Sequence, residues 1–189
     1  MADPEGEIMV LEDHITHDDF LRVANGQGWQ LRQTQRGDGE HVSFQEIWTT
    51  ADGKGVINFI DDPTLLSRQI WIRGEHLHEL HFELSRRLPA WEQEELLEHA
   101  VTAAGHDEAV KAILDLSAGF LRPDPDVIRM FEEYMSASSA LIRKATLQAI
   151  AYRMWPEAKP LVESAAANDP EESVRAFAAT LLQHPATTT

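Results

Sequence analysis

Cysteine is absent from this chain of 189 residues. Its absence excludes disulfide bonds, thiolate zinc and iron–sulfur sites, and catalysis by a thiol. Long apolar runs are missing as well, since no stretch of the sequence reaches the roughly 18 residues that a transmembrane helix needs. The acidic N-terminal segment lacks the apolar stretch of a signal peptide. The sequence therefore predicts a cytoplasmic protein, and nothing in it calls for a cofactor.

Basic residues are scarce: 16 lysines and arginines stand against 32 aspartates and glutamates, which gives a formal net charge of −16. Such a surface repels the phosphates of nucleic acids and anionic lipids, so neither nucleic-acid binding nor membrane docking is expected. It would attract a basic partner protein. Solubility alone is the other explanation of the charge.

Catalytic motifs are few. The sequence contains no serine-nucleophile motif, and its glycine-rich segments, around Gly37-Asp38-Gly39 and Gly53-Lys54-Gly55, are typical of hairpin turns and not of phosphate-binding loops. Glu46 lies on the predicted strand next to that of Asp61 and Asp62, and carboxylates placed together in this way could do acid–base chemistry. Two such aspartates before a proline also commonly end a strand.

The chain changes character near Leu88-Pro89. The first half alternates apolar and polar residues between turn signals, which is typical of strands. The expected elements are a helix over 16–26, strands over 29–36, 41–50, 56–60 and 68–73, and a helix over 74–87. Short turns favour an antiparallel sheet of four strands with flanking helices, an α+β domain over 14–88. A flexible acidic tail is expected over 1–13.

The second half repeats itself. Three similar steps, Val110-Lys111, Ile142-Arg143 and Val174-Arg175, follow one another at an offset of 32 residues. Asp124-Pro125 and Asp169-Pro170 are strong helix starts, because aspartate caps the helix and proline suits its first position. A fixed period with two helices in each unit predicts an α-solenoid, here of three helical pairs packed on the sheet.

The arginine steps, the small residues after them and the Asp169-Pro170 opening make residues 89–184 resemble the HEAT-like repeat family in its short bacterial form. The first unit departs most, with Lys111 in place of arginine and Gly105 in place of aspartate. The resemblance implies a scaffold that binds other proteins on its faces, and it implies no reaction. A short tail over 185–189 follows.

Aromatic residues suggest where a partner could bind. Tyr152, Arg153 and Trp155 lie together before Pro156, and Trp91 lies just after Pro89. Tryptophan, tyrosine and arginine dominate the energetics of many interfaces, so these four are the predicted partner-binding residues. Alternatively, Trp155 fills the gap between the second and third repeats.

Histidines gather between Glu75 and His81. On a helix His78 and His81 share a face, so they are candidate metal ligands together with a distant carboxylate such as Glu46 or Asp61. The alternative is a solvated helix face opposite the leucines of the same segment.

These features favour a small acidic protein-interaction module, an adaptor or inhibitor that binds a partner protein through the helical repeats. An immunity-type protein against a basic toxin is one form of it. The alternative is an enzyme or ligand-binding protein with a pocket between the sheet and the first repeat, using a His/Glu metal site.

Overall fold

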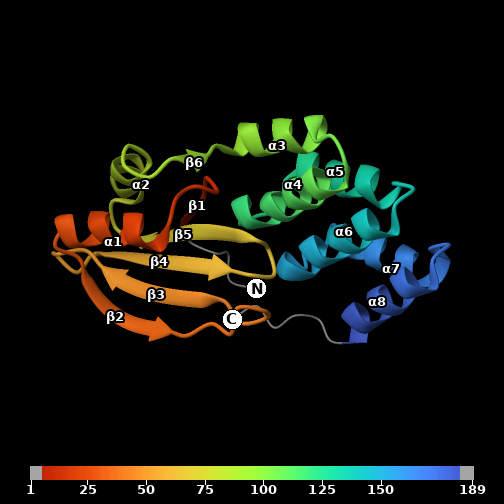
Figure 1. Ribbon diagram of the computed structural model, residues 1–189, viewed down its shortest axis with the longest axis horizontal. Helices are drawn as coiled ribbons and strands as arrows, with labels where there is room; N and C mark the ends of the chain where they lie inside the picture. The colour runs from red at the N-terminus through yellow and green to blue at the C-terminus, as the bar shows by residue number, and fades with distance from the viewer. Residues whose placement is uncertain (1–5, 184–189) are drawn as a thin grey trace. The chain divides into compact units, whose positions relative to one another are not determined.

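The computed structural model describes residues 6–183, and the predicted tail over 185–189 lies outside them. Six strands and eight helices occur within this range, which confirms the α+β class (Figure 1). The chain divides into two compact units, the first ending at Glu92 and the second beginning at Gln93. No helix among the described residues has both the length and the apolar character needed to cross a membrane.

The first unit is built on one antiparallel sheet with the strand order β2-β3-β4-β5-β1-β6. The strands are β1 (Glu7–Leu11), β2 (Gln30–Gln35), β3 (Phe44–Thr49), β4 (Gly55–Asp62), β5 (Ser67–Gly74) and β6 (Ala90–Trp91). Strands β2 to β5 form the predicted meander. The prediction of four strands was wrong because it missed β1 and β6, which join the sheet beyond β5.

Strand β1 corrects the predicted flexible tail over 1–13 at Glu7–Leu11, while residues 1–5 of that prediction lie outside the described residues. Its residues pair with β5, with Glu7 opposite Ile72 and Met9 opposite Ile70. Met9, Val10 and Leu11 are each only 1% exposed. Four consecutive apolar residues are typical of a buried strand, and the acidic residues on both sides obscured that pattern.

Two helices, α1 (His17–Gly26) and α2 (Leu77–Ser85), pack with one face of the sheet in a common core. Helix α1 begins with a capping box, in which Thr16 and Asp19 each bond the backbone N–H of the other. The core includes Phe20 from α1 and alternate residues of the central strands, such as Phe59 and Ile70. Burying each of these side chains contributes about 1.5–3 kcal/mol.

Six helices make up the described part of the second unit. They are α3 (Gln93–Thr102), α4 (His106–Gly119), α5 (Pro125–Met135), α6 (Ala140–Arg153), α7 (Lys159–Asn168) and α8 (Glu172–Gln183). Consecutive helices form three pairs, α3/α4, α5/α6 and α7/α8. The first helices of successive pairs also contact one another, as do the second helices. We call α3, α5 and α7 the A-layer, and α4, α6 and α8 the B-layer.

Candidate functional site

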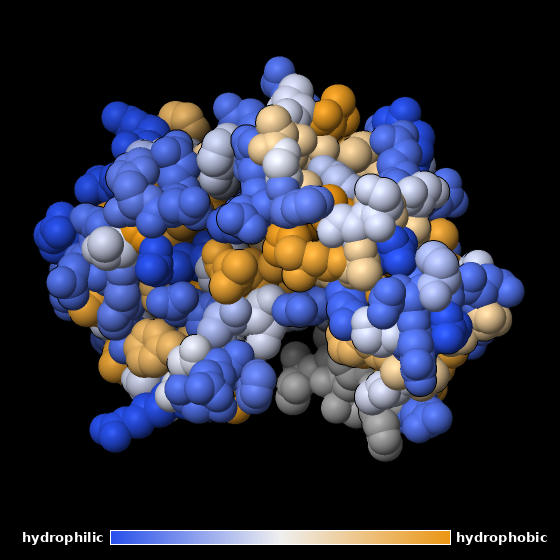
Figure 2. All heavy atoms as spheres, turned by 45° about the vertical axis from the view of Figure 1, so that its right-hand side comes forward, coloured by the Kyte–Doolittle hydropathy of each residue, from blue (hydrophilic) through white to orange (hydrophobic). Residues whose placement is uncertain are grey.

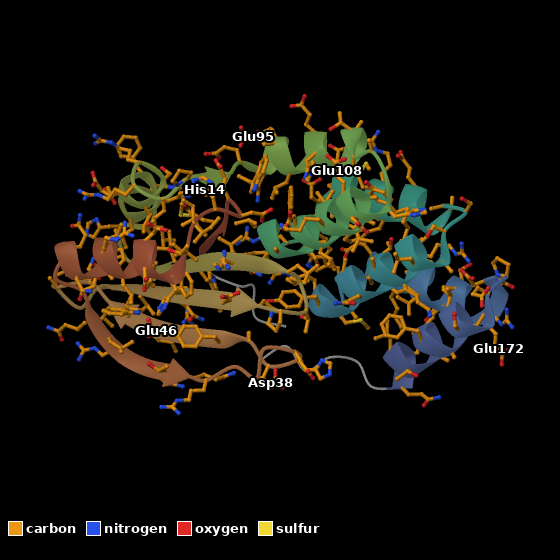
Figure 3. The ribbon with its side chains drawn as sticks, in the orientation of Figure 1. His14, Asp38, Glu46, Glu95, Glu108 and Glu172 are labelled. Atoms are coloured by element: carbon orange, nitrogen blue, oxygen red, sulfur yellow. The ribbon has the colours of Figure 1, made fainter. Side chains whose placement is uncertain are left out.

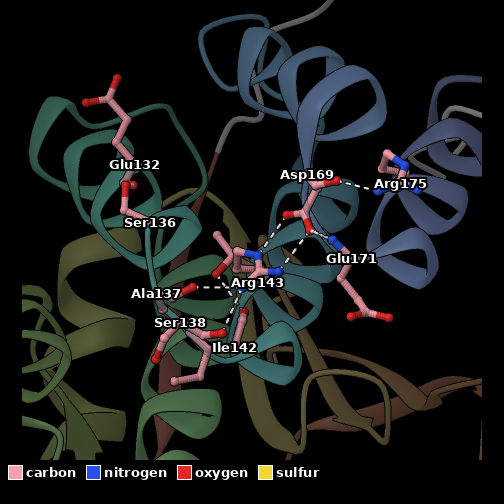
Figure 4. Close-up of polar contacts among 10 residues, drawn as sticks. Glu132, Ser136, Ala137, Ser138, Ile142, Arg143, Asp169, Glu171 and Arg175 are labelled. Carbon is pink, nitrogen blue, oxygen red and sulfur yellow. Dashed lines mark hydrogen bonds and ion pairs between the residues drawn. The ribbon is translucent and has the colours of Figure 1, made fainter.

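A buried ion pair links the second and third helical pairs. Arg143, on α6, donates from Nε to Oδ2 of Asp169 at 2.7 Å and from Nη2 to Oδ1 at 2.8 Å (Figure 4). Its Nη1 donates to the carbonyl oxygens of Ala137 and Ser138. The side chains of Arg143 and Asp169 are only 7% and 4% exposed. Such a satisfied pair in the interior holds the turn before α6 to the turn before α8.

The third pair repeats part of this geometry. Arg175 donates from Nη1 to the carbonyl oxygen of Asp169, which lies six residues earlier. Arg143 makes the same bond to Ala137, also six residues earlier. In the first pair, Lys111 instead contacts both carboxylate oxygens of Asp115 within its own helix. Arg143 and Arg175 therefore fasten the turns before their helices, whereas this contact of Lys111 stays within α4.

The ion pair also shifts the acidity of its two members. The side-chain hydrogen bond from Arg143 lowers the pKa of Asp169 below its usual value, and this effect exceeds the opposing one of burial. The same bond raises the pKa of Arg143. Both groups are therefore charged at neutral pH.

The predicted partner-binding residues in the second unit have partners of their own. Trp155 is 4% exposed and stacks on Phe131 with ring centroids 6.3 Å apart, so it fills the core and cannot anchor a partner in this conformation. Arg153 donates to the carbonyl oxygens of Ser117 and Ala118, near the end of α4. Its guanidinium lies 5.0 Å from the ring centre of Tyr152.

Trp91, the fourth predicted partner-binding residue, belongs to the first unit. It lies in β6 opposite Val10, and its side chain is half-buried. Tyr152 and Arg153 belong to the second unit. The four residues therefore do not form one patch within either unit.

Charge is distributed unevenly between the two layers of the second unit. The A-layer helices hold seven carboxylates and two basic side chains, a net charge of −5, while the B-layer helices hold four carboxylates and five basic side chains, a net charge of +1. All seven A-layer carboxylates are exposed: Glu94, Glu95, Glu98, Asp126, Glu132, Glu133 and Glu163. Figure 3 labels Glu95 on α3. The A-layer is the strongest candidate interaction surface of this unit.

The two histidines predicted as metal ligands, His78 and His81, lie close together in the structure. Both contact a carboxylate that was not predicted, that of Glu7. Nδ1 of His78 lies 2.6 Å from one oxygen of Glu7, and Nδ1 of His81 lies 2.6 Å from the other. The sequence predicts Glu46 or Asp61 as the carboxylate, because the acidic residues around Glu7 are typical of a tail and not of a strand. Across residues 6–183, no three or more histidine, aspartate or glutamate side chains are arranged to hold a metal ion.

Glu46 lies on the apolar face of β3 and is 7% exposed (Figure 3). It accepts a hydrogen bond from Nε1 of Trp48 at 3.0 Å, and Nε2 of His17 lies 3.0 Å from the same oxygen. The ring of His17 packs against Phe44 and Phe59. In the sequence, the position of Glu46 on an otherwise apolar strand face indicates that it has a buried partner. The sequence does not show that this partner is His17.

The two aspartates at the end of β4 have separate partners. Asp61 lies 3.3 Å from Nε of Arg68. Asp62 accepts hydrogen bonds from the backbone N–H of Thr64 and Leu65, which ends the strand. These contacts support the strand-ending explanation and not the acid–base one.

An open groove of about 480 Å³ lies in the first unit beside the loop between β2 and β3. Its lining includes Arg36, Val42, Phe44 and Asp61. Asp38 holds the loop by accepting hydrogen bonds from the backbone N–H of Val42, His41 and Glu40, which lowers its pKa to about 2. The groove gathers no set of groups suited to catalysis.

Comparisons with protein-family models, with curated proteins and with solved structures find no match to this chain. The charge on the A-layer was not predicted from the sequence, because the division of the helices into two layers depends on which helices contact one another.

Proposed function

We propose that the protein is an interaction module that binds a basic partner protein through the A-layer of a short HEAT-like α-solenoid. Two observations support the solenoid. Corresponding helices of successive pairs contact one another, and Arg143 and Arg175 make the same bond to the carbonyl six residues earlier. In repeat proteins of this kind, stacked pairs present extended surfaces on which partners bind.

The charge contrast between the layers carries the proposal. Hydrophilic residues cover most of the face drawn in Figure 2, as the net charge of −16 suggests. Within the second unit, however, the excess negative charge lies on the A-layer helices and not on the B-layer helices. An exposed ion pair contributes only about 0.2–1 kcal/mol, but a field of one sign speeds the encounter with a basic protein and selects against acidic ones.

The role that fits best is that of an adaptor or an inhibitor. An immunity-type protein that covers the basic surface of a toxin is one version. The contacts of the described carboxylates and histidines support a binding role over a catalytic one. Those whose side chains are buried hold the fold together. Glu46 and Asp169 are examples.

The test is a charge reversal on the A-layer, with the variant Glu98→Lys, Glu132→Lys and Glu133→Lys. All three side chains are exposed and none lies in the first turn of a helix, so the fold should persist. The tagged full chain is used to capture partners from native cell extract, followed by cross-linking and mass spectrometry. We expect the wild type to retain a basic protein whose cross-links map to α3 and α5.

The matched control changes the charge equally in the first unit, with Glu40→Lys, Glu75→Lys and Glu79→Lys, all exposed positions. This variant should retain the partner, whereas the A-layer variant should lose it. Equal retention by both variants, or cross-links confined to the sheet, would show that the A-layer is not the binding surface.

A further inference from the structure

Strand β2 forms one edge of the sheet and has an open side. It pairs with β3 alone, and no other strand among residues 6–183 lies along its second edge. All six of its side chains are exposed. The strand therefore contributes little to the core, and it presents backbone N–H and C=O groups on which another strand could pair.

Natural proteins usually protect such an edge, and the other edge of this sheet follows that rule. There, β6 has two residues and directly follows Pro89. Strand β2 has six residues and contains no proline or lysine. Its protection is limited to a bulge between Leu31 and Gln33 and to Arg32, whose Nε bonds Oγ1 of Thr49 on β3.

Strand β2 carries an arginine and no carboxylate, and Arg36 follows it directly, although Asp38 lies two residues further on and Arg22 is ion-paired with Asp19. The chain as a whole carries a net charge of −16. A second copy of the chain, paired edge to edge, would bring Arg32 and Arg36 near their own counterparts. Opposite charges on neighbouring strands stabilise pairing and like charges weaken it, so an acidic segment suits this edge better.

We infer that β2 is a docking edge for an extended acidic segment of a partner protein, which adds to the sheet as a further strand. Main-chain hydrogen bonds to β2 provide the pairing, and the arginines select the charge of the incoming segment. Leu31, which is 46% exposed, offers an apolar contact for one of its side chains. This site is separate from the A-layer and takes a partner of the opposite charge, so it does not depend on the proposed function.

The experiment uses the full chain and a synthetic eight-residue peptide that alternates glutamate with valine. A peptide that alternates lysine with valine is the control probe. Amide hydrogen exchange is followed residue by residue as each peptide is added. We expect the acidic peptide to slow exchange at β2 amides, and the basic peptide to leave them unchanged.

Charge-reversal variants then test the arginines. Arg32→Glu with Arg36→Glu should weaken binding of the acidic peptide about tenfold, because each reversed charge costs part of the cross-strand energy. Arg86→Glu with Arg87→Glu makes the same change in net charge near the end of α2 and should weaken it less than about twofold, since only screened long-range charge is altered. If the first variant loosens the hairpin itself, seen as fast exchange in β3, the single change Arg36→Gln beyond the strand replaces it and should still weaken binding.

Three results would overturn the inference. One is unchanged exchange in β2 at saturating acidic peptide. Another is equal slowing by the two peptides, which would show pairing without selection by charge. The third is slowing that grows with protein concentration in the absence of peptide, since it would assign the edge to a second copy of the chain.

Discussion

At the scale of single residues, the buried pair of Arg143 and Asp169 joins the second and third helical pairs of the second unit. Removing one partner leaves the other charge buried and uncompensated, which typically costs 3–5 kcal/mol. Asp169→Ala should therefore lower the free energy of unfolding by about that amount in urea titrations. Asp126→Ala is the control, because its ion pair with Arg129 is exposed and should be worth less than about 1 kcal/mol. A loss of less than about 1 kcal/mol in the unfolding free energy of Asp169→Ala would contradict the assigned role.

The same pair predicts a dependence on acid. Because the pKa of Asp169 is lowered in the folded state, its contribution to stability is fully present above the unfolded value of 3.8 and is lost as the pH falls through the folded pKa. Unfolding free energies measured at a series of pH values should fall less steeply below pH 3.8 in Asp169→Asn than in the wild type. Asp38 and Asp19 keep lowered pKa values in the first unit, so part of the acid slope remains. Identical slopes for the two proteins would be evidence against this linkage.

At the scale of elements, Trp155 packs the segment after α6 against α5. Its ring is 4% exposed and stacks on Phe131. Trp155→Ala should cost about 3–5 kcal/mol of stability, because it removes a large buried side chain and leaves a cavity. The measurement is chemical unfolding, paired with a partner-binding titration corrected for the folded fraction. A variant of full stability that no longer binds would restore Trp155 as a partner-binding residue.

Local pattern predicted some elements of the first unit and missed others for a physical reason. Strands β2 to β5 follow one another through short turns, so each is visible from its own residues and its neighbours. Strand β1 pairs with β5 across some sixty residues, and Glu7 meets His81 over a separation of 74. No local periodicity reports such a contact. Glu46 was visible as a charge on an apolar face, but its partner His17 lies on a different element.

At the scale of the whole molecule, the net charge favours a basic partner but does not indicate which surface would bind it. The sum of −16 is a property of composition and is blind to position. The division into A-layer and B-layer requires the helix pairs and their contacts. Likewise the net charge does not reveal the arginines of and beside β2, on which the proposed preference of this sheet edge for an acidic segment rests.

The proposed role of the A-layer predicts how binding depends on salt. Screening shortens the reach of exposed charges from about 30 Å at 0.01 M to about 8 Å at 0.15 M ionic strength. The association rate with the basic partner should therefore fall about tenfold or more over this range in stopped-flow measurements, while the dissociation rate changes less. Reversal of Glu98, Glu132 and Glu133 should weaken this dependence, because it changes the net charge of the A-layer helices from −5 to +1. An association rate that is insensitive to salt in the wild type would mean that the A-layer charge serves solubility and does not steer a partner.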